Sequence, residues 1–162
     1  MALINSVLLV AEVANNTSNA ILISLLATLG FTFFSVVISS IYKKNFIEPV
    51  LLSKVINYHL KDSPTWLNRV LGTTIHFFMG YLFAEAHLFL YRILTPAWYN
   101  ALFLGLANGI LGALVWYAVI RIYRKVLTVN VSQYLIQLVI GHIIFALIIV
   151  YMYAPPHLSA NL

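Results

Sequence analysis

Residues 19–42 read NAILISLLATLGFTFFSVVISSIY, an apolar stretch without a charged side chain, and Lys43 and Lys44 follow it directly. A helix needs about 20 predominantly apolar residues to cross the hydrocarbon core of a bilayer. The stretch is long enough for one crossing, and the two lysines suit the headgroup region at its end. It therefore predicts a transmembrane helix and makes lipid the natural solvent for the chain.

The composition of the whole chain agrees with a membrane protein. Of its 162 residues, 62% are apolar and 8% are charged, whereas soluble domains carry about 25% charged residues. The net charge of +5 comes from basic residues at the ends of apolar runs, where they meet lipid headgroups. We therefore expect residues 1–162 to form a single membrane domain that contacts the lipid bilayer and binds no nucleic acid. The absence of cysteine excludes disulfides and cysteine-ligated metals.

Three later stretches have the same apolar character, and each lacks an internal proline that would kink a helix. Tyrosine and tryptophan gather near their ends, as interface anchors do. The sequence predicts an all-α, polytopic, multi-pass protein, a four-helix bundle with spans at about residues 19–42, 70–91, 97–120 and 131–153.

The distribution of basic residues predicts the orientation of these spans. Lysine and arginine are concentrated between the first and second spans and between the third and fourth, whereas Arg92 is alone in the remaining loop and both tails have none. The positive-inside rule places both basic loops in the cytoplasm. We therefore expect a cell-membrane protein with its N- and C-termini on the non-cytoplasmic side.

The first basic connection contains a second helical pattern, at about residues 46–60. Apolar residues recur there at helical spacing, with polar residues on the other side, and Pro49 suits a first helical turn. The pattern predicts an amphipathic helix on the cytoplasmic membrane surface, the alternative being a partly structured loop. Met1–Val13 is apolar but short, which favours an interfacial helix or a loose lid.

Small and polar residues form stripes along the predicted spans. Helices in lipid associate through such residues, because apolar side chains gain little by leaving the lipid tails. The glycines that we expect to pack against neighbouring helices, including the Gly105-x-x-x-Gly109 pair, are Gly72, Gly80, Gly105, Gly109, Gly112 and Gly141.

The second span has two polar faces. His76 and His87 lie on one face, and Glu85 lies about 180° away with Thr74 and Tyr81. Because neither face suits lipid, we expect this span at the centre of the bundle, or with its second face against a partner subunit.

Two intramembrane histidines suggest a cofactor hypothesis. Ionisable residues within a span are costly and default to functional candidates. His76 and His142 fall in the inner half of the bilayer on parallel spans and could face each other, so they are candidate axial ligands of a haem b iron. The alternative is two neutral imidazoles hydrogen-bonded to nearby polar groups.

Glu85 leads to a transport hypothesis. A carboxyl group in lipid has a raised pKa and can hold a proton, so Glu85, with His87 and Arg92, is a candidate proton or ion site of a small proton-coupled transporter. The alternative is a structural pair, because Arg92 lies two turns away on the face of Glu85.

The residue inventory favours a protein that is not an enzyme. The only aspartate is Asp62, and there is no phosphate-binding glycine loop, no H-E-x-x-H motif and no paired carboxylate site. The function that we predict is packing against a second copy or a membrane partner. The alternatives are a bis-histidine haem b electron carrier and a proton-coupled transporter.

Overall fold

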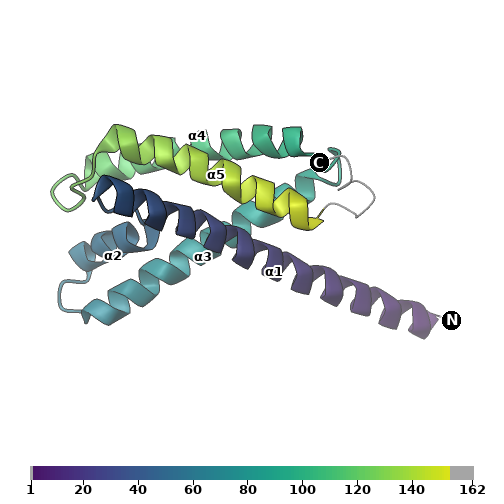
Figure 1. The fold of residues 1–162 in the computed structure, drawn as a ribbon. Coiled ribbons are helices and arrows are strands. Elements are labelled where there is room, and N and C mark those ends of the chain that lie inside the picture. Colours follow the sequence, from purple (N-terminus) through teal and green to yellow (C-terminus); the bar gives the residue numbers. More distant parts are fainter. Residues whose placement is uncertain (1, 154–162) are drawn as a thin grey trace.

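The structure, a computed structural model, describes residues 2–153, together with the side chains of residues 19–153. The described chain is entirely helical between its turns and contains no β-strand. Its five helices are α1 (Ala2–Tyr42), α2 (Glu48–His59), α3 (Thr65–Leu90), α4 (Trp98–Ile122) and α5 (Val131–Tyr153) (Figure 1).

Three segments are long and apolar enough to cross a membrane: Asn19–Tyr42 of α1, and the whole of α4 and α5. These match three of the predicted spans. Helix α3 has comparable length, but His76, Glu85 and His87 lower its hydropathy. The apolar N-terminal segment is not separate from the first span, because α1 is continuous over 41 residues, or about 60 Å at 1.5 Å per residue.

Helices α1 and α5 occupy the centre of the bundle. Helix α4 packs against α5, α3 packs against the other side of α1, and α2 packs against α3 (Figure 1). Helix α3 therefore lies at a flank of the bundle and not at its predicted centre. On its second face Thr74 is exposed, while Tyr81 and Glu85 are half-buried.

Close helix contacts occur at several of the predicted glycines. A Cβ atom on Gly109 of α4 would lie 2.9 Å from the Cα of Val139 on α5, and one on Gly105 would lie 2.7 Å from the Cα of Ile143. On α3, a Cβ at Gly72 would lie 2.6 Å from the carbonyl oxygen of Pro49 on α2. A side chain at any of these positions would separate the two backbones.

The predicted 46–60 segment forms α2 with Pro49 in its first turn. Its buried residues are Glu48, Leu51 and Ser53. The buried face therefore includes a carboxyl group, whereas the amphipathic pattern predicts an apolar face.

The two basic connections lie at the same end of the bundle. Lys44, just after α1, donates to Gln133 at the start of α5 over 3.2 Å. His59, at the end of α2, is 2.7 Å from the hydroxyl of Tyr123, just after α4. The 91–97 turn, which joins α3 to α4, lies at the opposite end (Figure 1).

Candidate functional site

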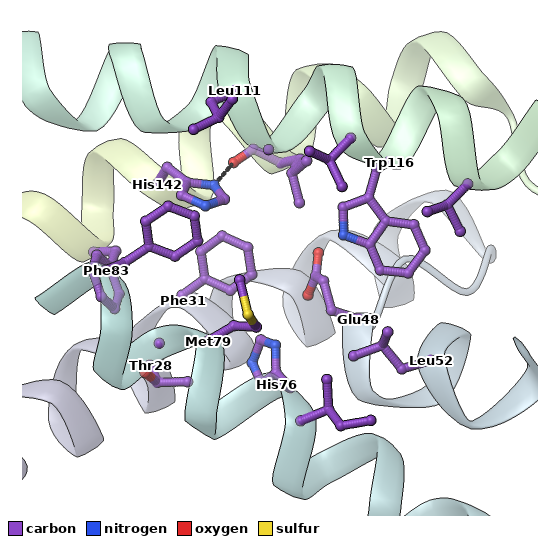
Figure 2. A pocket seen from close by; sticks show the side chains of 17 residues that line it. Thr28, Phe31, Glu48, Leu52, His76, Met79, Phe83, Leu111, Trp116 and His142 are labelled. Atoms are coloured by element: carbon purple, nitrogen blue, oxygen red, sulfur yellow. Dashed lines mark hydrogen bonds between the residues drawn. The ribbon is translucent and has the colours of Figure 1, made fainter. Parts of the chain in front are cut away.

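A cavity of about 400 Å³ lies where α3 and α4 diverge. The two helices are joined by the 91–97 turn and separate from it, so they scarcely touch (Figure 1). All five helices contribute lining residues, and the wall is mostly apolar and aromatic. Figure 2 shows the polar side chains that interrupt this wall, among them Thr28, Glu48, His76 and His142.

Glu48 is a buried acid at the edge of this cavity, with 3% of its surface exposed. Its Oε2 accepts a hydrogen bond of 3.1 Å from Oγ of Ser35, which itself accepts one of 2.6 Å from Nε2 of Gln137. The other carboxyl oxygen, Oε1, is buried without a hydrogen-bond partner. Burial raises the pKa of Glu48 to about 8, although hydrogen bonds from its own backbone and from Ser35 oppose the rise. The acid is therefore mostly neutral at pH 7.

The local sequence explains how Glu48 comes to be buried. Ile47 is extended and precedes the helix, and Pro49 suits its first turn. Glu48 then shares a helical face with Leu51 and Leu52, so packing the leucines inward buries the acid as well. Glu48 is not among the site residues predicted from the sequence, although a glutamate on the leucine face of F-I-E-P-V-L-L is a usable signal.

His76 on α3 is anchored by α1. Its Nε2 lies 2.9 Å from Oγ1 of Thr32, and that hydroxyl donates its proton to the carbonyl oxygen of Thr28 at 2.7 Å. Thr32 must then accept from His76, which places the imidazole proton on Nε2. In the neutral ring, Nδ1 is left as a hydrogen-bond acceptor.

His142 on α5 is anchored within its own helix. Its Nδ1 donates to the carbonyl oxygen of Leu138 over 2.9 Å, so Nε2 of the neutral ring is an acceptor. The phenyl ring of Phe31 lies between the two imidazoles, with its centroid 5.9 Å from that of His76 and 5.1 Å from that of His142 (Figure 2).

The two predicted haem ligands, His76 and His142, thus line one cavity. Axial ligation of a single iron would require the Phe31 ring to leave the space between them, and Nε2 of His76 is already bonded to Thr32. Haem b binding stays a prediction. Among the residues whose side chains are described, no three His, Asp or Glu groups gather as a metal site would require.

The predicted proton-site residues lie apart from this cavity. His87 is 1% exposed, and its Nδ1 donates to the carbonyl oxygen of Phe83 over 2.8 Å. Its ring packs against Phe145 of α5. Arg92 is exposed, and Glu85 is half-buried on the opposite face of α3 from His87. The structure does not gather these three side chains, and a proton site at Glu85 stays a prediction.

Comparisons with protein-family models, curated proteins and solved structures find no match for this chain. The candidate site must therefore be interpreted from its own chemistry.

Proposed function

We propose that this chain is a four-span membrane protein that binds a lipophilic small molecule in the cavity between α3 and α4. The observation that carries the proposal is a largely apolar cavity of about 400 Å³ whose wall is interrupted by a few polar groups, among them Glu48, His76 and His142. Ligand sites combine these same features: apolar walls for affinity and a few placed polar groups for orientation.

The arrangement of the loops supports α3 as the fourth span. Helix α3 follows the basic end of the bundle, where the His59–Tyr123 contact lies, and α4 begins at the opposite end. The chain must cross between these ends before residue 98, and α3 is the helix that does so. At 26 residues it extends about 39 Å, which exceeds a hydrocarbon core of about 30 Å. Both basic loops would then be cytoplasmic, with α2 beside that surface and both termini outside.

The exposure of the cavity rim supports entry of the ligand from lipid. Met79 of α3 and Leu111 and Val115 of α4 line the cavity, and each is more than 40% exposed. Large apolar side chains that are this exposed would contact lipid tails in the proposed orientation. A molecule dissolved in the bilayer would reach the cavity laterally between α3 and α4.

A second copy or another membrane protein could cover the same rim, as the packing hypothesis supposes. The unpaired carboxyl oxygen of Glu48 favours a small-molecule ligand over a packed helix as the occupant of this rim. A polar group of a ligand could bond to Glu48, whereas an apolar helix packed over the rim would leave the acid unpaired.

Quenching of tryptophan fluorescence tests the proposed site. Trp116 lines the cavity, whereas Trp66 and Trp98 are exposed. In lipid nanodiscs, a Trp66→Phe, Trp98→Phe variant would report from Trp116 alone. We expect 4-(4-bromophenyl)butan-1-ol, whose bromine quenches indole, to give saturable quenching.

A matched pair of valine substitutions controls for probe dissolved in the bilayer. Val115→Phe narrows the cavity and should abolish saturation, whereas Val36→Phe on the outer surface of α1 should not. Quenching that rises linearly with probe concentration in every variant, for this alcohol and for its amine analogue, would overturn the proposed function.

A further inference from the structure

Resting on this proposed function, we propose that the cavity selects lipophilic amines in their protonated form. The ammonium group would donate hydrogen bonds to Glu48 and to one of the two imidazoles, and the apolar part would lie between α3 and α4. The amine would replace the proton that Glu48 carries in the empty site.

The hydrogen-bonding capacity left over in the cavity is mainly that of acceptors. Oε1 of Glu48 has no partner. The bonds to Thr32 and Leu138 use the ring protons of His76 and His142, which leaves one acceptor nitrogen on each neutral ring. An ammonium group carries only donors, up to three of them, and so complements this set.

The cavity also lacks a positive charge to pair with its one acid. Glu48 lines it, but the lining contains no lysine, arginine or second acid. An ionised carboxylate buried without a cation is strongly disfavoured, which is why the empty site holds a proton. A ligand cation would supply the missing partner.

The aromatic lining adds a further attraction for cations. Phe31, Phe83 and Trp116 line the cavity together with the polar groups (Figure 2). Aromatic faces attract cations, most strongly where water is excluded. A neutral ligand of the same shape would lack this attraction.

Binding of the ammonium ion is then linked to release of a proton. One proton leaves the carboxyl group of Glu48 as one ammonium ion enters, so the net charge of the site is unchanged. Of the other titratable groups, Tyr134 of α5 interacts electrostatically with Glu48, and His76 of α3 and His142 of α5 line the same cavity. The buried pair Ser35 and Gln137 completes its surroundings but does not titrate.

The test compares 4-(4-bromophenyl)butan-1-amine with the corresponding alcohol, using quenching of Trp116 in nanodiscs. The two probes share their apolar part and differ in the terminal group. Because Glu48 must lose its proton and has a pKa of about 8, affinity for the amine should rise about 100-fold between pH 6 and pH 9. Affinity for the alcohol should stay unchanged over this range.

Substitution of the acid provides the decisive control. Glu48→Gln should lose both the preference for the amine over the alcohol and the pH dependence of amine binding, whereas Asp62→Asn in the exposed 60–64 turn should behave as wild type. Persistence of the pH dependence in Glu48→Gln would assign it to the imidazoles and overturn the proposal. Equal binding of amine and alcohol in the wild type would overturn it too, while leaving the proposed cavity intact.

A calorimetric measurement on the wild type does not depend on whether Glu48→Gln folds. Titration of the amine at pH 7 in two buffers of different ionisation enthalpy counts the protons released. We expect about 0.9 proton per bound amine, because a carboxyl group of pKa about 8 is largely protonated at that pH. No release would contradict the exchange.

Discussion

The hydroxyl of Ser35 donates a hydrogen bond of 3.1 Å to the carboxyl group of Glu48, thirteen residues further along the chain. The hydroxyls of Thr28, Thr32 and Ser39, also on α1, donate to carbonyl oxygens four residues earlier in the same helix. Ser35 instead links α1 to α2, and through Gln137 to α5. One hydroxyl thus joins three helices beside the cavity.

Loss of this hydroxyl should destabilise the protein. Ser35→Ala leaves Oε2 of Glu48 and Nε2 of Gln137 buried without their partner, which costs about 1–3 kcal/mol. Ser40→Ala is the matched control, because the exposed Ser40 bonds only to Val36 of its own helix and should lose less than about 0.5 kcal/mol. Thermal unfolding in detergent compares the two, and equal midpoints would show that the link contributes nothing.

The stability of the unliganded protein should fall between pH 5 and pH 8. Glu48 has a raised pKa in the folded protein, so over this range the folded state retains a proton that the unfolded state has lost. The contribution of this protonated carboxyl group to the free energy of unfolding is therefore fully present below about pH 4.5. It decreases by up to about 1.4 kcal/mol per pH unit until the pH passes 8.

Glu48→Gln isolates this contribution from the other titrating groups. A glutamine cannot ionise, so the variant should gain stability relative to wild type as the pH rises from 5 to 8.5. Unfolding midpoints of the two proteins should therefore diverge with pH. If they run in parallel, the ionisation of Glu48 is not coupled to folding.

The contact between α4 and α5 should tolerate an added methyl group at one glycine and not at another. A Cβ on Gly109 meets the backbone of Val139 at 2.9 Å, whereas one on Gly112 meets first the movable ring of His142 at 3.1 Å. Both substitutions to alanine gain the same helix propensity, so their difference reports packing. We expect Gly109→Ala to be less stable than Gly112→Ala by about 1–3 kcal/mol, measured by thermal unfolding.

The absence of cysteine makes the chain a direct background for mapping its orientation. Asp62, Thr95 and Thr128 are exposed in turns. In intact cells, a membrane-impermeant maleimide should label Thr95→Cys, whereas Asp62→Cys and Thr128→Cys should react only after permeabilisation. The reverse pattern would invert the proposed orientation, and reaction of all three in intact cells would refute it.

Local patterns were sufficient to predict the helical segments. A chain in lipid must satisfy its backbone hydrogen bonds within each helix, so a long apolar run is by itself enough to specify a helix. That is why residues 19–42 and 131–153 are recognisable without any tertiary information. The packing role of Gly105 and Gly109 is also predictable from the local sequence, because their four-residue spacing puts both on one face of the helix.

The tertiary structure alone decided which polar groups meet. Ser35 and Gln137 are 102 residues apart and form a bond of 2.6 Å, and the ring of Phe31 separates two histidines that the spacing suggested could face each other. Such contacts depend on the rotation, tilt and relative height of different helices. Hydropathy and periodicity describe one helix at a time. Residues 19–42 therefore predict a membrane helix, but they do not predict that Ser35 binds the buried acid of α2 at the edge of the cavity.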